Sequence, residues 1–207
     1  MWARVKASQV IEIINGAKAM TIDGTQYPAS IFRIWSAADL KAKGLYSYTE
    51  TGQKDPTYYN MGAIKYTVDD DKGTVVGTYT TTAKGMDDVK WTSKEISDGD
   101  APAGATTDTV KTEGLKTMWT NKIKQQTNSL LQPYDWYSLR KAQAGTAIPS
   151  DINTYMNAVR TASAVNEANV ASTSDVDQMI ERASDTFDKD GVWTANSVYN
   201  EWPTPPE

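Results

Sequence analysis

Residues 93–109 contain almost no apolar side chain, and they separate two parts of the chain with different hydrophobic patterns. Ser, Asp, Gly, Ala and Thr dominate this stretch, a composition typical of linkers. The residues before it turn and alternate as β-strands do, and those after it repeat apolar positions at helical spacing. We therefore predict an α+β fold. Its parts are a small β-hairpin-rich N-terminal domain (1–92), a flexible linker (93–109), a C-terminal helical domain of three to four helices (110–190) and an extended Trp/Pro-rich tail (191–207).

Two hairpins are the clearest features of the N-terminal part. Residues 20–27 place Asp23-Gly24 between two short β-prone runs, and this dipeptide tolerates the positive φ pair of a type I′ turn. Residues 64–68 alternate in polarity, and the chain returns over residues 75–82 after an acidic, Gly-containing turn. Between the two hairpins, a Ser-Ala-Ala-Asp run starting at Ser36 predicts the N-cap of a short helix.

Apolar residues at steps of three, four and seven predict the helices of the second part. One stripe runs along residues 115–130 and stops at Pro133, and a shorter helix follows that ends at Gly145. A third helix is predicted to begin at 149–151, where Pro precedes Ser-Asp. A fourth helix is predicted over about residues 173–187.

The composition excludes several classes of function. The 207 residues include neither Cys nor His, which rules out disulfides, zinc–thiolate sites, cysteine nucleophiles and Ser-His-Asp triads. A net charge of −5 gives no basic field for nucleic acid, and no run approaches the roughly 18–20 apolar residues of a membrane span. The N-terminus lacks a signal-peptide pattern, so we expect synthesis in the cytoplasm. We predict a non-enzymatic protein with no catalytic residue, no cofactor and no metal, and with neither nucleic acid nor membrane as a partner.

Acidic residues provide the alternatives to that prediction. Asp87-Asp88, together with Glu50, would suit a hydrolase if two carboxyls lay about 5–10 Å apart in a cleft. Acids at 69–71 lack the alternate spacing of a calcium loop and are interpreted as a solvated turn. The aspartates at 185–190 are interpreted as a polar helix exit in preference to a cation site.

The aromatic residues provide a different alternative, a carbohydrate-binding module. The chain has seven Trp and eleven Tyr against two Phe, and Trp and Tyr suit half-wet surfaces and interfaces. Such a module predicts that the Trp and Tyr residues of 46–91, among them Tyr58-Tyr59, lie exposed in a row.

The order of motifs along the chain resembles that of tail-assembly chaperones and tail-fibre-associated proteins of tailed bacteriophages. The second part has a Leu-Leu pair, an Asp-Trp step, a helix with Tyr and Arg, and a terminal Trp-Pro. The first part, with its Gly-Thr-Gln-Tyr-Pro run at 24–28 and its Phe-Arg-Ile-Trp-Ser run at 32–36, is similar to N-terminal domains of small marine-phage tail proteins.

This resemblance implies a bacteriophage tail or tail-fibre protein, a virion structural or adaptor component made in the host cytoplasm. Its implied partners are other tail or fibre proteins, and its implied state is a homo-oligomer, a trimer or a six-fold related assembly. The alternatives are a tail-fibre assembly chaperone absent from the mature particle and the carbohydrate-binding receptor-recognition module. The partner-interface residues that the resemblance implies are Leu130, Leu131, Tyr134, Asp135, Trp136, Tyr155, Arg160, Trp202 and Pro203.

Overall fold

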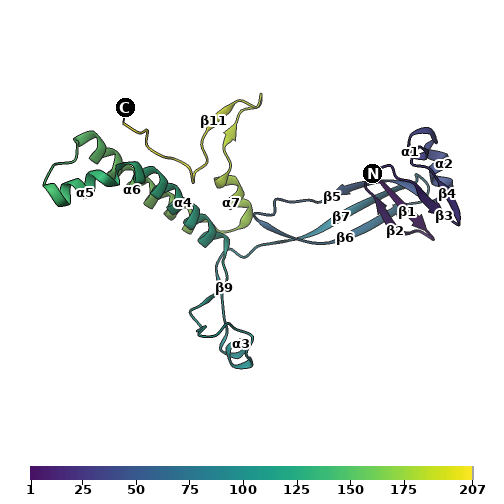
Figure 1. Cartoon of the computed structure of the whole chain (residues 1–207), viewed down its shortest axis with the longest axis horizontal. Helices are drawn as coiled ribbons and strands as arrows, with labels where there is room; N and C mark the ends of the chain where they lie inside the picture. Colours follow the sequence, from purple (N-terminus) through teal and green to yellow (C-terminus); the bar gives the residue numbers. More distant parts are fainter. Residues whose placement is uncertain (207) are drawn as a thin grey trace. The chain divides into compact units, whose positions relative to one another are not determined.

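The computed structural model describes residues 1–206. The chain divides into two units, Met1–Ala83 and Lys84–Glu207, each with more contacts inside it than outside. A sheet dominates the first unit and helices dominate the second, which confirms the predicted α+β class (Figure 1).

A five-stranded sheet of order β2-β1-β5-β7-β6 forms the first unit. β7 lies between β5 and β6, parallel to β5 and antiparallel to β6. The strands of this sheet are β1 (Trp2–Lys6), β2 (Gln9–Ile14), β5 (Leu45–Thr51), β6 (Tyr59–Asp69) and β7 (Thr74–Ala83). The other elements of the unit are β3 (Met20–Ile22), β4 (Thr25–Tyr27), α1 (Ile31–Ile34) and α2 (Ala37–Ala42).

Both faces of this sheet bury apolar side chains. Successive residues of a strand point to opposite faces, so the neighbours Leu45 and Tyr46 belong to different core clusters. On one face the core consists of Ile14, Met20, Ile22, Ile31, Phe32, Leu40 and Leu45, drawn from the sheet, the β3–β4 hairpin, α1 and α2. On the other face it consists of Ala3, Val5, Tyr46, Tyr48 and Val75. The two edge strands β2 and β6 contact each other, so the sheet curls over this second cluster.

Local sequence signals account for the turns and the short helix of this unit. Asp23 and Gly24 have φ values of 47° and 82°, which confirms the hairpin predicted over residues 20–27. Ser36 accepts a hydrogen bond from the Asp39 backbone N–H, and the Asp39 side chain accepts one from Ser36 in return. This capping box confirms Ser36 as the N-cap of α2.

The second unit is built on two helices, α4 and α6, that pack against each other. Their buried side chains include Leu115, Trp119 and Ile123 from α4 and Tyr155 and Val159 from α6. The helices of the unit are α3 (Ser93–Asp98), α4 (Leu115–Leu131), the 3-10 helix η1 (Gln132–Tyr134), α5 (Asp135–Ala144), α6 (Ser150–Ala171) and α7 (Val176–Ala183). Its strands are β8 (Val89–Lys90), β9 (Val110–Thr112), β10 (Thr186–Phe187) and β11 (Trp193–Ala195).

The ends of these helices follow the predicted signals. Pro133 lies in η1, where α4 has ended, and Gly145 at the C-cap of α5 has a φ of 67°. α6 begins at Ser150, directly after Pro149. The last helix is shorter than predicted, because α7 ends at Ala183 and Phe187 belongs to β10.

The observed division between the units differs from the predicted one. It falls after Ala83, and residues 93–109, predicted as an interdomain linker, lie inside the second unit as the connection between β8 and β9. This connection contains α3, which has no buried residue and is stabilised at its start by a capping box of Thr92 and Glu95. A polar segment can therefore be helical without an apolar face, because its cap supplies the local hydrogen bonds.

The Glu95 carboxylate gives this capping box a testable pH dependence. It accepts hydrogen bonds from Lys111 and from Thr92, which lower its pKa from 4.5 to about 2. A carboxyl whose folded pKa is lowered contributes stability above its unfolded pKa and loses it as pH falls through the folded value. We expect the Glu95 carboxyl to titrate near pH 2 by NMR, and Lys111→Ala to move the midpoint toward 4.5. An unchanged midpoint in that variant would contradict the assigned cause.

Candidate functional site

The C-terminal tail docks on the α4–α6 pair, and Tyr199 is its anchor. The Tyr199 side chain is 1% exposed, and its ring centroid lies 5.4 Å from that of Trp119. The hydroxyls of Tyr199 and Thr173 are 2.6 Å apart. Because Thr173 already donates its hydroxyl proton to the Asn169 carbonyl, the Tyr199 hydroxyl is the donor in this pair.

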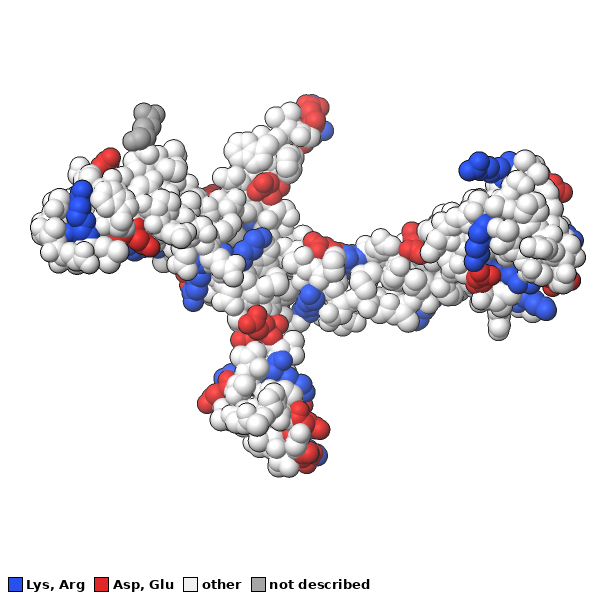
Figure 2. All heavy atoms as spheres, viewed as in Figure 1, with Lys and Arg blue, Asp and Glu red and all other residues white. Residues whose placement is uncertain are grey.

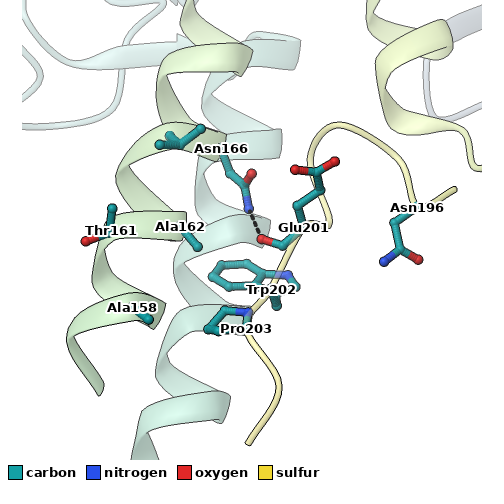
Figure 3. A pocket seen from close by; sticks show the side chains of 9 residues that line it. Ala158, Thr161, Ala162, Asn166, Asn196, Glu201, Trp202 and Pro203 are labelled. Atoms are coloured by element: carbon teal, nitrogen blue, oxygen red, sulfur yellow. Dashed lines mark hydrogen bonds between the residues drawn. The ribbon is translucent and has the colours of Figure 1, made fainter. Parts of the chain in front are cut away.

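Residues 200–206 continue the tail along the groove between the two helices, and we call them the strap. The Nδ2 of Asn166 donates to the Glu201 carbonyl at 3.4 Å, as Figure 3 shows. On the α4 side, the Nε2 of Gln126 donates to Asn200 Oδ1, also at 3.4 Å. Trp202 donates from its indole N–H to the same Asn200 oxygen at 3.1 Å. The strap therefore contacts both helices.

Open space flanks the strap on both sides. Between the strap and α6 lies a groove of about 630 Å³, whose floor includes Ala158 and Ala162 (Figure 3). A second hollow of about 460 Å³ lies on the α4 side, between Leu130 and Trp202. A third, also about 460 Å³, lies around Pro203. The strap thus lies in a channel that it does not fill.

The structure brings four of the nine implied interface residues to this channel. Leu130 and Trp202 line its α4 side, and Tyr155 and Pro203 line the hollow farther along α6. The Tyr155 ring also packs on Tyr134, with centroids 5.2 Å apart. Burial raises the pKa of the Tyr155 hydroxyl above its ordinary value, and the neighbouring Tyr134 adds to this.

The remaining implied residues lie elsewhere on the unit. Leu131 is half-buried at the end of α4. Asp135 and Trp136 begin α5 and are exposed. Arg160 is exposed on α6, where its Nη1 donates a hydrogen bond of 3.3 Å to Asn157 Oδ1 of the same helix.

Helix α5 carries large apolar side chains on its surface. None of its ten residues, all within the described part of the chain, is buried. Trp136 is 49% exposed and Leu139 60% exposed. The Arg140 guanidinium lies over the rings of Trp136 and Tyr137, at 4.8 and 5.4 Å, and its Nε has no acceptor among residues 1–206. Aromatic and arginine side chains are enriched at protein interfaces.

The β10–β11 hairpin forms a second exposed apolar surface in the same unit. Phe187 pairs with Trp193 across the hairpin, and both rings are exposed, as is Val192 between the strands. A two-stranded hairpin without a covering layer is marginally stable on its own. Its apolar side chains therefore remain available for a partner.

The acidic residues considered for catalysis each make local contacts. Asp88 accepts the Gly114 N–H at 2.7 Å, at the start of α4, and Asp87 pairs with Lys116 at 3.1 Å. In the first unit, Glu50 accepts the hydroxyls of Tyr48 and Tyr79 at 3.0 and 3.1 Å.

The acidic groups considered for a cation are likewise engaged locally. Asp188 accepts two backbone N–H groups of its own turn, those of Asp190 and Val192. Asp185 accepts the Ser197 N–H at 2.7 Å, which holds the start of the tail. Within residues 1–206, no group of three His, Cys, Asp or Glu residues could hold a metal ion.

The aromatic row expected of a carbohydrate-binding module is not present in the first unit. Tyr46, Tyr48, Tyr58 and Tyr59 are buried and Tyr79 is half-buried, which leaves Tyr66 as the exposed ring within residues 46–83. Trp91, the remaining ring of the predicted row, lies in the second unit and is also half-buried. On the face drawn in Figure 2, Lys and Arg side chains alternate with Asp and Glu and form no continuous basic stripe. Among residues 1–206 we find no helix with the length and apolar character needed to cross a bilayer.

Comparison with known proteins adds no relative. No family model, no curated protein and no solved structure matches the chain. The proposal below therefore rests on the exposed surface of α5 and on the order of motifs along the chain.

Polar residues of the α6 region hold the tail, and the sequence carries one signal of them that was not used in the predictions above. Asn166 and Thr173 both lie on the buried side of the α6 region, four residues before and three residues after the buried Val170. A buried polar side chain needs a hydrogen-bond partner, and here the partners are the Glu201 carbonyl and the Tyr199 hydroxyl. Polar residues on an apolar helical stripe thus indicated a segment that packs across them.

Proposed function

We propose that the chain is a non-enzymatic component of a bacteriophage tail or tail fibre, which joins other tail proteins through its second unit. The motif order supports the phage assignment, and the surface of α5 supports a role in protein–protein contacts. Its partners are other tail or fibre proteins, and it acts as a homo-oligomer of three-fold or six-fold symmetry.

One observation carries this proposal: α5 exposes Trp136 and Leu139 side by side and buries none of its own residues. A helix gains most of its stability in a protein from packing an apolar face. Here that face is open, and contact with a partner would cover it. Trp and Arg, which make up this surface with Leu139, are among the residues that dominate binding energy at interfaces.

Counting the protein in purified virions tests its place in the particle. We expect quantitative mass spectrometry to find copies in multiples of three or six relative to the major tail protein. Abundance in infected cells combined with absence from particles would contradict a virion component and would identify an assembly chaperone.

A double variant tests the α5 surface. Trp136→Ala with Leu139→Ala removes two exposed side chains, so folding is little affected, but an interface loses two anchors. We expect at least a tenfold loss of incorporation into particles, measured by the same mass spectrometry, since about 1.4 kcal/mol of binding energy corresponds to a factor of ten. The control is Ile34→Ala, at a 72% exposed position of the first unit. Equal incorporation of the double variant and the control would exclude α5 as the contact.

A further inference from the structure

Helix α5 and the β10–β11 hairpin lie at opposite ends of the α4–α6 pair. The two long helices run antiparallel, since Thr127 bonds Ser163 at 2.8 Å and Lys124 pairs with Glu167 at 3.8 Å. α5 connects the end of α4 to the start of α6, whereas α7 and the hairpin follow the end of α6 (Figure 1). The 22 residues of α6 span about 33 Å, which separates the two surfaces within one chain.

The exposed face of α5 is apolar and basic. Trp136, Leu139, Arg140 and Gln143 follow the i, i+3, i+4, i+7 spacing that places side chains on one face of a helix. Residues 136–149 contain two bases, Arg140 and Lys141, and no acid. Neither base forms an ion pair with any of residues 1–206. This face therefore presents positive charge that the described part of the chain does not neutralise.

The β10–β11 hairpin is apolar and acidic. Every residue from Thr186 to Ala195 is exposed, including the apolar Phe187, Val192 and Trp193. Residues 185–195 contain three aspartates and one lysine, and acidic side chains gather at the tip of the hairpin in Figure 2.

Two of these aspartates have no cation beside them. Asp190 pairs with Lys189 at 2.7 Å. Asp185 and Asp188 accept backbone N–H groups and form no ion pair within residues 1–206. The hairpin thus combines exposed apolar rings with a charge opposite to that of the α5 face.

We propose that the α5 face of one copy docks on the β10–β11 hairpin of a second copy. Apolar side chains on each surface would cover those of the other, and the bases of α5 would face the aspartates of the hairpin. Exposed ion pairs add little affinity, so the apolar side chains supply most of the binding and the charges set its orientation.

This inference rests on the proposed function, because it names the partner of the α5 surface. In a ring of three or six identical copies, each copy presents two different surfaces to its two neighbours. A contact between α5 and the hairpin is of this kind, whereas a contact between two α5 helices would end at a dimer. Complementary surfaces at opposite ends of one unit therefore suit the three-fold or six-fold assembly of the proposed function.

Sedimentation equilibrium of the full chain tests the contact. We expect complexes larger than a dimer at about 100 μM, a concentration that nearly saturates a contact of micromolar dissociation constant. Two variants each remove one surface: Trp136→Ala with Leu139→Ala on α5, and Phe187→Ala with Trp193→Ala on the hairpin. Each should weaken association about tenfold or more, because each deletes two interface anchors. Normal assembly of either variant would overturn the proposal.

Mixing the two double variants gives a sharper result. The α5 variant keeps an intact hairpin and the hairpin variant keeps an intact α5, so the mixture retains one matching pair of surfaces. We expect one-to-one complexes in the mixture and nothing larger. A mixture that stays monomeric would overturn the contact between α5 and the hairpin.

Cross-linking tests the same contact without removing an apolar side chain. The chain has no cysteine, so a single introduced thiol is unique. A mixture of Gln143→Cys and Lys189→Cys chains, treated with a bismaleimide, should yield cross-linked pairs that contain one chain of each kind. The control replaces Gln143→Cys by Ser138→Cys, an exposed position on the opposite side of α5. Equal yields from the two mixtures would contradict docking through the Trp136–Leu139 face.

Particle incorporation separates this proposal from the proposed function. A wild-type chain that stays monomeric overturns the contact between copies. If the α5 double variant nevertheless enters virions poorly, α5 binds another tail protein and the proposed function stands. If the wild type is monomeric and that variant enters virions normally, the role proposed for α5 fails as well.

Discussion

Tyr199→Ala is expected to lower the free energy of unfolding by about 3–5 kcal/mol, the range typical of a buried aromatic side chain replaced by alanine. The ring is 1% exposed and packs on Trp119, so its loss leaves a cavity at the junction of the tail and the helices. Urea unfolding of the full chain, followed by far-ultraviolet circular dichroism, measures the change.

Tyr199→Phe is the matched control for that variant, since it keeps the ring and removes the hydroxyl. Thr173 retains its bond to the Asn169 carbonyl, so the expected loss is about 0.5–1.5 kcal/mol, that of one hydrogen bond. Equal losses in the two variants would show that the hydroxyl, and not the packing of the ring, anchors the tail. A loss below about 1 kcal/mol in Tyr199→Ala would contradict the anchor altogether.

Gly114→Ala is expected to destabilise the start of α4 by about 1–3 kcal/mol, because it overpacks a position without free space. An added Cβ would lie 2.4 Å from the Asp87 carbonyl carbon and 2.6 Å from the Met86 carbonyl oxygen. Both are backbone atoms, which cannot rotate away as a flexible side chain could. Thermal unfolding followed by circular dichroism should show a lower midpoint.

Gly85→Ala provides the control for this second prediction. It precedes Met86 and Asp87, the residues that Gly114 packs against, is exposed, and its added Cβ would come no closer than 3.5 Å to the Asp87 carbonyl oxygen. We expect a change within about 1 kcal/mol. If Gly114→Ala were as mild as Gly85→Ala, the close backbone packing at the start of α4 would have to be abandoned.

Elements determined by neighbouring residues were predicted correctly from the sequence. The Asp23-Gly24 hairpin, the Ser36 cap of α2 and the end of α5 at Gly145 each depend on backbone conformations or hydrogen bonds within a few residues. The long helices were also predicted, because their apolar stripes repeat at the helical period over several turns.

Pairings between distant segments were not predictable in the same way. β5 was not predicted as a strand, and its parallel pairing with β7 places a later strand between β5 and β6. The division of the units was also misplaced, since the polar composition of 93–109 indicated a linker but its capping box and the β8–β9 pairing hold it within the second unit.

The candidate site shows the same limit. The resemblance implied a partner interface of nine residues, and the structure brings four of them, Leu130, Tyr155, Trp202 and Pro203, to the channel that the chain's own strap occupies. The resemblance did not identify Tyr199 as the anchor, because Tyr199 and its partner Thr173 are 26 positions apart. No local pattern connects two residues at that separation.

The start of α4 sets the minimum length of any autonomous helical fragment of this protein. The N–H groups of Gly114, Leu115 and Lys116 donate to the Asp88 side chain and to the carbonyls of Gly85 and Met86. A fragment beginning at residue 110 would therefore leave the three donors at the first turn of α4 without their protein acceptors. Limited proteolysis that leaves a stable helical core should cut before Gly85, not within the polar stretch that the sequence offers as the obvious boundary.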